Sequence, residues 1–126
     1  MPQVWVYGTL KKGGANHHYL AQSMYRGQAT LTFQGRLFDV GFPVLMKSRN
    51  KINIEGELYD VDRETFDRLD RLEGNGHMYQ RRRKRLADGR YAWIYIGKNS
   101  FWQPRAYGRP VMPQADGIIR WNRSAR

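Results

Sequence analysis

The hydrophobic pattern at the start of the chain predicts a strand. Val4 and Val6 fall on one face of this strand, because side chains alternate between faces. Trp5 and Tyr7 fall on the other face, and Gly8 breaks the run. We therefore expect a short strand that leads into a glycine-bearing loop.

Further stretches rich in β-forming residues follow. Residues 25–40 predict one bent strand or two short ones, because glycines interrupt them, and residues 41–44 predict a turn. Residues 52–61 predict the next strand. Residues 79–86 and 90–97 flank the sequence ADGR, which suits a tight turn, so they predict a hairpin.

Between these strands the period of the pattern changes and predicts a helix. Phe66, Leu69 and Leu72 fall on one helical face. Asp62 is a suitable N-cap residue, and Gly74 can end the helix in a left-handed conformation. This segment is the clearest helix in the sequence.

Many short strands and few helices indicate an α+β fold. Residues 16–22 predict a second, shorter helix. With 126 residues the chain has room for one core, so we expect residues 1–126 to form a single domain, with residues 113–126 as a flexible basic tail. Short strands expose their edges unless a sheet closes, so a closed or nearly closed small barrel is expected.

The net charge of the chain indicates the charge of its binding partners. The formal net charge is +11, and the excess of basic residues is concentrated in residues 81–85 and 120–126. Such a balance favours anionic partners. Nucleic acid, acidic metabolites and acidic protein surfaces all qualify, so charge alone does not select a function.

Two absences narrow the function classes. Apolar stretches such as residues 42–46 are far below the about 20 residues that cross a bilayer, so we expect no membrane insertion. The chain has no cysteine, which excludes disulfides, thiolate nucleophiles and zinc–thiolate sites. This composition is compatible with a reducing compartment, and we expect a cytoplasmic protein.

Glu73 stands where the predicted helix ends. A helix C-terminus carries partial negative charge, which disfavours a carboxylate and raises its pKa. Glu73 is therefore either an acid that points into water or a proton acceptor in a reaction. The residues around it leave both interpretations open.

The sequence VYGTLKKG, residues 6–13, is a second candidate. Successive backbone N–H groups in such a turn can converge on an anion or a carbonyl oxygen. Gly8 allows a ligand to approach closely. Turns of this kind also often serve only to reverse the chain, so the segment by itself does not decide the matter.

Other candidates have structural explanations as well. His17 and His18 are adjacent and point in different directions, so they cannot form a paired metal site by themselves, and surface or packing roles are the alternative. Glu55 and Glu57 share one strand face. They are either a catalytic carboxylate pair or polar residues on a face that is exposed to solvent. The basic residues 81–85 form two rows that are either solvated or steer an anionic substrate.

Several short motifs occur in a fixed order. They are VWVYGTLKKG at 4–13, NH at 16–17, EGELY at 55–59, LDRLEG at 69–74 and YQR at 79–81. Together they resemble the γ-glutamylcyclotransferase family, in particular its AIG2-like members and the γ-glutamylaminecyclotransferases. The combination is far more specific than any single motif.

The resemblance implies a fold, a site and a reaction. The fold would be a small mixed β-barrel with flanking short helices. Glu73 would be the general acid and base. The residues implied in substrate binding are Tyr7, Gly8, Thr9, Leu10 and Tyr79. The family converts a small-molecule γ-glutamyl substrate to 5-oxoproline and a free amine, and the reaction needs no cofactor and no metal.

The chain departs from the family pattern in two places. Residues 74–78 contain two glycines where many relatives have a more rigid linker, so we expect Glu73 to be less firmly held. The match becomes weaker after about residue 98, in the region where relatives differ in how they select the leaving amine. The amine half of the substrate therefore stays open.

Two alternatives to a γ-glutamylamine cyclotransferase remain. One is a cyclotransferase that acts on another γ-glutamyl conjugate. The other is a basic module that binds nucleic acid through residues 81–85 and the C-terminal arginines. Aromatic residues are not interleaved with the basic run as base stacking requires, so nucleic acid is the less favoured partner.

Overall fold

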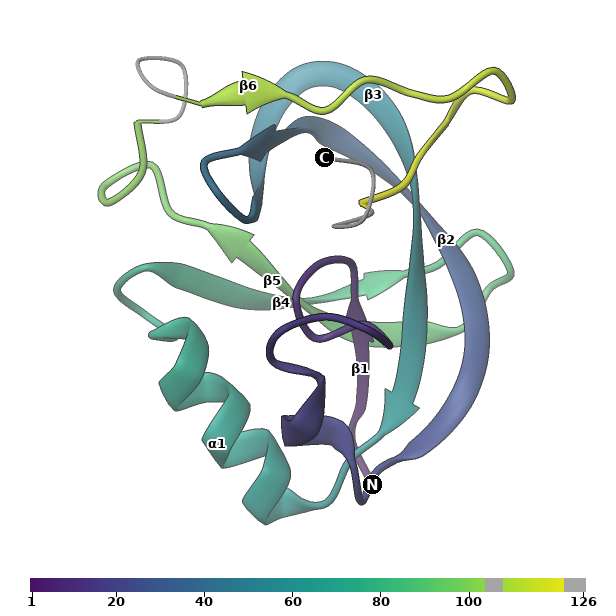
Figure 1. The fold of residues 1–126 in the computed structure, drawn as a ribbon, viewed down its shortest axis with the longest axis vertical. Helices are drawn as coiled ribbons and strands as arrows, with labels where there is room; N and C mark the ends of the chain where they lie inside the picture. The colour runs from purple at the N-terminus through teal and green to yellow at the C-terminus, as the bar shows by residue number, and fades with distance from the viewer. Residues whose placement is uncertain (104–107, 122–126) are drawn as a thin grey trace.

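The computed structural model describes residues 1–103 and 108–121 (Figure 1). The α-helix lies to one side of the long paired strands in that view. The elements in chain order are β1 (Gln3–Val6), the 3₁₀ helix η1 (His17–Leu20), β2 (Met24–Asp39), β3 (Pro43–Asp60), α1 (Arg63–Glu73), β4 (Tyr79–Arg85), β5 (Tyr91–Gly97), β6 (Arg109–Pro110) and β7 (Ile118–Ile119).

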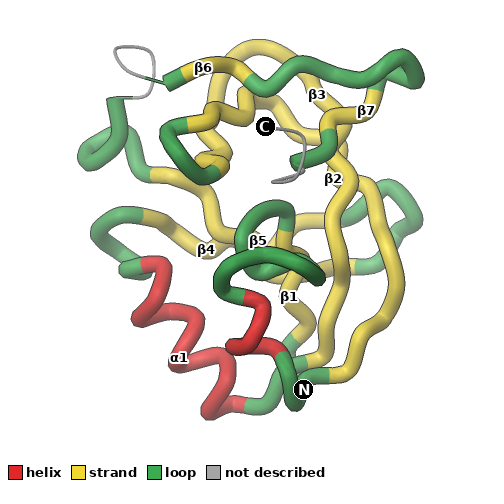
Figure 2. Tube along the Cα trace, viewed as in Figure 1, coloured by secondary structure: helices red, strands yellow, loops and turns green. Residues whose placement is uncertain are grey.

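The strands of the described residues form one mixed sheet. Their order is β4-β5-β1-β3-β2-β6, and β7 pairs with β3. β1 is parallel to β5 and β7 is parallel to β3, whereas the other neighbours are antiparallel. The expected α+β fold with a small mixed barrel is confirmed, as a curled sheet that forms a half-barrel with α1 and η1 beside it (Figure 2).

The curl is built into the β2–β3 pair. Its register shifts between Tyr25 and Gln28, and again where Gln34 pairs with Lys51 but Gly35 pairs with Lys47. Such irregularities bend a strand and increase its twist. Of the two predictions for residues 25–40, one bent strand or two short ones, β2 confirms the first.

The predicted start of the next strand at residue 52 is wrong. β3 begins at Pro43, and its first residues, Val44 to Met46, are buried against β2. The sequence hides this part of the strand because polar residues 47–51 separate it from the alternating segment. Only cross-strand pairing with β2 identifies it.

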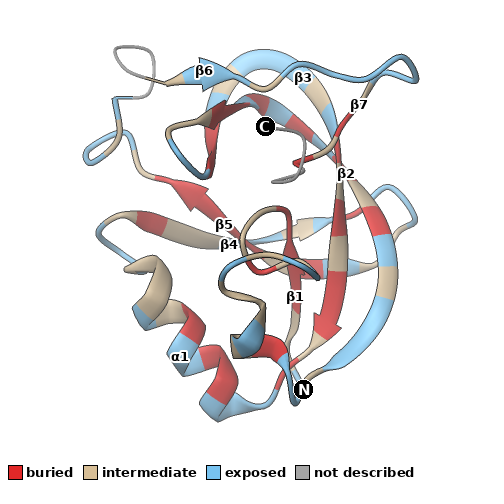
Figure 3. Ribbon diagram, in the orientation of Figure 1, coloured by how far each residue is buried: buried red, intermediate tan, exposed pale blue. Residues whose placement is uncertain are grey.

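β1 is buried on both faces, as Figure 3 shows. Trp5 and Tyr7 belong to an apolar cluster that also contains Ile94 of β5. Val4 and Val6 belong to a second cluster, shared with α1. The predicted alternation of β1 is therefore confirmed, and the strand separates two apolar clusters.

The helix has the predicted boundaries. The Asp62 side chain accepts a 2.7 Å hydrogen bond from the Thr65 N–H, which caps the N-terminus. Gly74 ends the helix in the left-handed region with φ 59° and ψ 50°. Phe66 and Leu69 are buried and Leu72 is half-buried, so the predicted face packs against the sheet.

The remaining elements are short. β4 and β5 form the predicted hairpin, in which Gly89 has φ 93°, and η1 lies within residues 16–22. Within the predicted basic tail, residues 118–119 form β7, whereas residues 122–126 lie outside the described residues. No helix in the described ranges is long and apolar enough to cross a membrane.

Candidate active site

A cavity of about 880 Å³ lies where β1 leads into its loop. The residues that the family resemblance implies in catalysis and substrate binding all line it: Tyr7, Gly8, Thr9, Leu10, Glu73 and Tyr79. They come from the loop directly after β1, from the last residue of α1 and from the first residue of β4. The fold thus brings together residues that are far apart in the chain.

The loop after β1 is held by its own hydrogen bonds. The Lys11 N–H donates to the Gly8 carbonyl at 3.0 Å, and the Asn16 N–H donates to the Thr9 carbonyl at 2.9 Å. The Asn16 amide also donates to the Thr9 hydroxyl at 3.0 Å. A Nδ1···O contact of 2.9 Å joins the His17 ring to the Leu10 carbonyl, so η1 also supports the loop.

Within the described residues, no group accepts a hydrogen bond from the backbone N–H groups of Gly8, Thr9 or Leu10. Leu10 is buried, and Gly8 and Thr9 are half-buried. Backbone N–H groups withdrawn from water are nearly always paired. These donors are therefore available to a bound molecule in the cavity.

The space beside Gly8 is occupied by protein. A Cβ atom added to Gly8 would lie 2.4 Å from Cγ of Pro43, which also lines the cavity. Glycine at this position thus lets β1 and the start of β3 approach each other. We expected a ligand to approach closely at Gly8, but Pro43 fills the space where a Cβ would lie.

Glu73 is a half-buried acid in a low-polarity setting. Burial raises its pKa from an ordinary value of 4.5 to about 7. In the described part of the chain no group forms a hydrogen bond or ion pair with its carboxylate. The shift therefore comes from loss of water, and Glu73 can both accept and donate a proton near neutral pH.

Three buried tyrosines surround this carboxylate. Burial raises the pKa of Tyr7, Tyr79 and Tyr95 well above the ordinary tyrosine value, and the charge of Glu73 adds to the shift at each. The Tyr7 hydroxyl donates to the Tyr95 carbonyl at 2.8 Å and accepts from the Leu45 N–H at 3.3 Å. Tyr7 thus contributes its ring to the cavity, because its hydroxyl is used within the sheet.

Tyr79 lies differently from Tyr7. Its ring packs edge-on against Trp102, with centroids 5.8 Å apart. Among the described residues its hydroxyl has no hydrogen-bond partner. This hydroxyl, next to Glu73, is free to contact a ligand.

Asp70, one turn before Glu73, ties the helix to the sheet. Its Oδ1 accepts from the Tyr95 hydroxyl at 2.6 Å and from Arg81 Nε at 2.9 Å. The Arg81 guanidinium also lies over the Phe66 ring, 4.4 Å from its centroid. Sequence reasoning missed Asp70 and Tyr95, because a pairing between a helix and a distant strand leaves no local signal.

The linker after Glu73 is more ordered than its glycines suggest. The Gly76 N–H donates to the Tyr79 carbonyl at 2.7 Å, and the Asn75 side chain accepts from the Arg81 N–H at 3.0 Å. The Trp102 indole donates to the Met78 carbonyl at 2.9 Å. These hydrogen bonds order the linker, whereas the expectation that Glu73 itself is less firmly held stays a prediction.

Charged residues form another wall of the cavity. Glu55 and Glu57, which were expected to share one face of a strand, both line it. Glu57 accepts from the Lys12 N–H at 2.9 Å and from the Tyr59 hydroxyl at 3.0 Å, whereas Glu55 forms an ion pair with Arg120 at 3.2 Å. Both carboxylates are thus already engaged by the protein, unlike Glu73.

The remaining candidates contribute little to the cavity. Across the described ranges, no group of His, Asp or Glu side chains is arranged to hold a metal ion. His17 supports the loop and His18 packs against Tyr19, with ring centroids 4.8 Å apart. In the basic run, Arg81 is engaged by Asp70, and Arg83 lies over the Tyr91 ring.

Comparison with known structures agrees with this arrangement. An AIG2-like protein from Mus musculus superposes with a TM-score of 0.73 at 24% sequence identity, covering 100% of this chain and 99% of that one. At this identity the likeness supports the fold. The chain therefore has the fold of an AIG2-like protein.

Sequence comparison gives the family. A Vibrio cholerae protein provisionally named γ-glutamylcyclotransferase is 39% identical over 94 residues, which cover 74% of this chain and 79% of that protein. Gamma-glutamylaminecyclotransferase A of Danio rerio is 30% identical over 130 residues, which cover 90% of this chain and 78% of the relative. The family model described as gamma-glutamyl cyclotransferase, AIG2-like, matches residues 4–117. The chain belongs to this AIG2-like γ-glutamyl cyclotransferase family.

Proposed function

We propose that this protein releases 5-oxoproline and a free amine from γ-glutamyl amines or related γ-glutamyl amides. In such a molecule the α-amine can reach the γ-carbonyl carbon, so its attack closes a five-membered lactam. Proximity is already present in the substrate. The tasks left to the protein are to move a proton, to stabilise an oxyanion and to protonate the leaving amine.

Glu73 performs both proton transfers in this proposal. Its carboxylate takes a proton from the α-ammonium group, and the neutral amine then attacks the γ-carbonyl carbon. When the bond from this carbon to the leaving nitrogen breaks, Glu73 returns the proton to that nitrogen, and the second proton that the ring nitrogen loses in becoming the lactam N–H also passes to the freed amine, which leaves as an ammonium ion. General acid–base catalysis of this kind contributes about 10²- to 10⁴-fold. A pKa of about 7 suits both directions of transfer.

The backbone N–H groups of Gly8, Thr9 and Leu10 bind the substrate. They face either the oxyanion that forms from the γ-carbonyl oxygen or the α-carboxylate. If a donor is aimed at the oxyanion, it contributes about 2.7–4 kcal/mol. The hydroxyl of Tyr79 is a further contact on the same side as Glu73, and no cofactor takes part.

The observation that supports this proposal most strongly is that one cavity holds both an acceptor and donors that have no hydrogen-bond partner among the described residues. The Glu73 carboxylate and the backbone donors of the β1 loop both line the cavity, and neither has a partner among the described residues. Polar groups that are partly withdrawn from water and lack partners can bind a ligand that enters the cavity. A γ-glutamyl substrate supplies the ammonium and the oxygens that these groups lack.

The direct test is product analysis with γ-glutamyl-ε-lysine. We expect mass spectrometry to find 5-oxoproline and lysine in equal amounts. Glutamate in place of 5-oxoproline would indicate hydrolysis and contradict the cyclisation. The same assay with other γ-glutamyl conjugates tests the alternative cyclotransferase, which would release 5-oxoproline from one of these conjugates and not from the γ-glutamyl amine.

The nucleic-acid alternative makes a different prediction. Phosphate binding by the basic run would give an affinity that falls steeply with salt and is unaffected by Glu73. Arg81 and Arg83, however, are engaged within the protein. We therefore favour a small-molecule partner, and a cytoplasmic location remains part of the proposal.

A further inference from the structure

The segment 114–121, named here the C-terminal strap, forms one wall of the cavity. Gln114, Arg120 and Trp121 of the strap line it. β7 within the strap runs parallel to β3, with Ile118 opposite Asn53. Trp121 is buried. The strap therefore lies against the sheet and presents an indole side chain beside the cavity.

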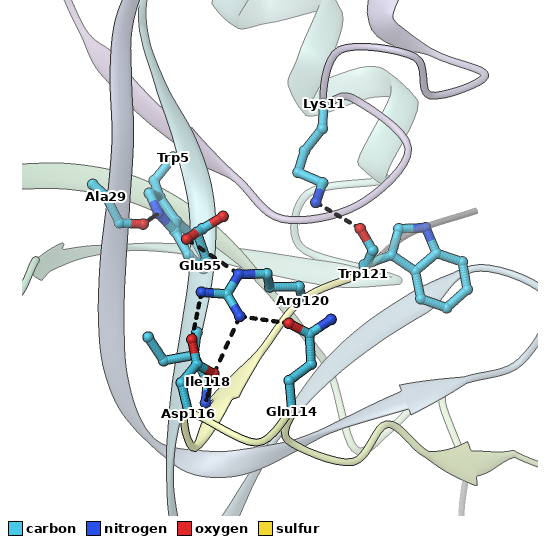
Figure 4. Close-up of polar contacts among 9 residues, drawn as sticks. All are labelled: Trp5, Lys11, Ala29, Glu55, Gln114, Asp116, Ile118, Arg120 and Trp121. Atoms are coloured by element: carbon cyan, nitrogen blue, oxygen red, sulfur yellow. Dashed lines mark hydrogen bonds and ion pairs between the residues drawn. The ribbon is translucent and has the colours of Figure 1, made fainter. Parts of the chain in front are cut away.

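Arg120 fastens this strap in two directions (Figure 4). Within the strap, its guanidinium donates to Gln114 Oε1 at 2.6 Å and to Asp116 Oδ2 at 2.8 Å. Toward the sheet, its Nε lies 3.2 Å from Glu55 Oε2, and both side chains of this pair are only about a quarter exposed. The guanidinium fork thus holds the strap to itself and to β3.

Lys11 fastens the strap from the other side. Its Nζ donates to the Trp121 carbonyl at 2.6 Å (Figure 4). Burial lowers the pKa of Lys11, while Glu57 and Glu55 oppose this shift. Lys11 follows Leu10 directly, so the strap is joined to the loop that carries the unpaired backbone donors.

The proposed reaction uses only part of the cavity. The γ-glutamyl group reacts between Glu73 and the loop, whereas Arg120 and Trp121 take no part in proton transfer. Of the charges near the strap, Glu55 and Arg120 are already paired with each other. Indole rings, Trp121 and Trp102, line the cavity as well. Paired charges and aromatic surface suit an apolar chain better than a second ion.

We propose that Arg120, Glu55 and Lys11 are positioning residues that hold Trp121 as the wall of the leaving-group region, so that this wall selects γ-glutamyl amides by the size of the alkyl part of the amine. The inference rests on the proposed cyclotransferase function, because it assigns the amine half of that substrate. It predicts that loosening the strap admits longer alkyl amines. The chemical step on a short amine is little changed, because Glu73 and the loop donors are untouched.

Two sets of ligands test this inference. N-methyl and N-hexyl glutaramates carry the same γ-amide without the α-amine, so they cannot cyclise, and calorimetry gives their dissociation constants. The γ-glutamyl amides of methylamine and hexylamine give the rates of 5-oxoproline release. The variants are Arg120→Gln and Glu55→Gln. Arg90→Gln is the matched control, because Arg90 forms an exposed ion pair with Asp88 and does not line the cavity.

The wild type is expected to bind the methyl ligand more tightly than the hexyl ligand, as a graded preference under which a longer amine such as lysine is still accepted. In Arg120→Gln and Glu55→Gln this preference falls by about 10-fold, the low end of what one misfitted group changes in a hydrophobic pocket. Arg90→Gln keeps the wild-type ratio. Lys11→Met removes the contact from the loop to Trp121, so it should also lower the preference for the methyl ligand. This variant tests the inference if Arg120→Gln fails to fold.

The outcomes separate the two proposals. If the strap variants change the ratio of the dissociation constants of the two glutaramates but no protein releases 5-oxoproline, the strap is supported as a selective wall and the cyclotransferase function is contradicted. If 5-oxoproline is released and the preference for the methyl over the hexyl ligand is the same in the wild type and in every variant, the function is supported and the role of the strap is overturned. Equal weakening of both ligands also overturns it, because a merely structural role affects short and long amines alike. If neither analogue binds the wild type, the inference fails.

Discussion

The Tyr95 hydroxyl donates a 2.6 Å hydrogen bond to the Asp70 carboxylate, and this bond joins β5 to the helix that ends at Glu73. The backbone carbonyl of the same Tyr95 accepts a hydrogen bond from the hydroxyl of Tyr7, the first residue after β1. A single residue thus connects the strand that carries the β1 loop with the helix that carries the carboxylate. The relative placement of the two halves of the cavity depends on this connection.

Replacing Tyr95 by Phe is expected to destabilise the fold and impair turnover. The change removes one hydrogen bond to a charged acceptor, which costs about 1.5–3 kcal/mol in the free energy of unfolding. Because it displaces Glu73 without altering the loop donors, we expect kcat to fall by at least about 10-fold with a smaller change in KM. Urea unfolding and steady-state kinetics measure the two effects.

Tyr91→Phe is the matched control for this change. Tyr91 lies on the same strand, is exposed and has no hydrogen-bonded hydroxyl among the described residues. Its removal should leave both stability and kcat within error of the wild type. An equal effect of the two substitutions would mean that the bond to Asp70 does not position the helix.

Glu73 is expected to make stability depend on pH. Its pKa is raised by burial from 4.5 to about 7, so the unfolded chain loses this proton first as pH rises. The wild type therefore loses stability between about pH 4.5 and about pH 7, by up to about 3 kcal/mol from this group. Glu73→Gln has no such titration. The difference in unfolding free energy between the variant and the wild type should grow from pH 4 to pH 8, and a constant difference would show that the carboxyl is not desolvated.

Gly8→Ala is expected to strain the contact between β1 and β3. The new Cβ would meet Cγ of Pro43 at 2.4 Å. Overpacking of this kind costs about 1–3 kcal/mol. Pro43→Ala makes room for the methyl group, so the double variant should recover part of the loss in a double-mutant cycle. If the destabilising effects of the two substitutions simply add in thermal unfolding, the added methyl group and Pro43 do not clash.

Two neighbouring arginines of the basic run should differ in importance. Arg81 binds Asp70 and covers the Phe66 ring, so Arg81→Gln should lower the free energy of unfolding by about 1–2 kcal/mol. Arg82 is exposed, and Arg82→Gln should stay within about 0.5 kcal/mol of the wild type. Each change removes one positive charge, so a common loss would point to net charge as the cause.

Local signals predicted the elements whose causes are local. Asp62 and Gly74 bound α1 because capping depends on a few adjacent residues. The alternation of β1 was visible because one strand with apolar residues on both faces leaves a clear pattern. The early start of β3 was not visible, because it is set by pairing with β2 across polar residues.

The site shows the same division. Glu73 and the β1 loop were found through a family resemblance, since nothing local in the sequence reveals that they share a cavity. Arg120 and Trp121 were not identified as site residues, because a two-residue strand, β7, brings them to the cavity. The apolar residues near Trp121 were the only local signal of that strand.

The most direct measurement compares the release of 5-oxoproline from γ-glutamyl-ε-lysine by the wild type and by Glu73→Gln. The substitution keeps the shape of the side chain and removes its ability to exchange a proton. We predict a decrease in kcat of about 10²- to 10⁴-fold with bound substrate retained. Equal rates for the two proteins would contradict the assignment of Glu73 as the proton-transferring group.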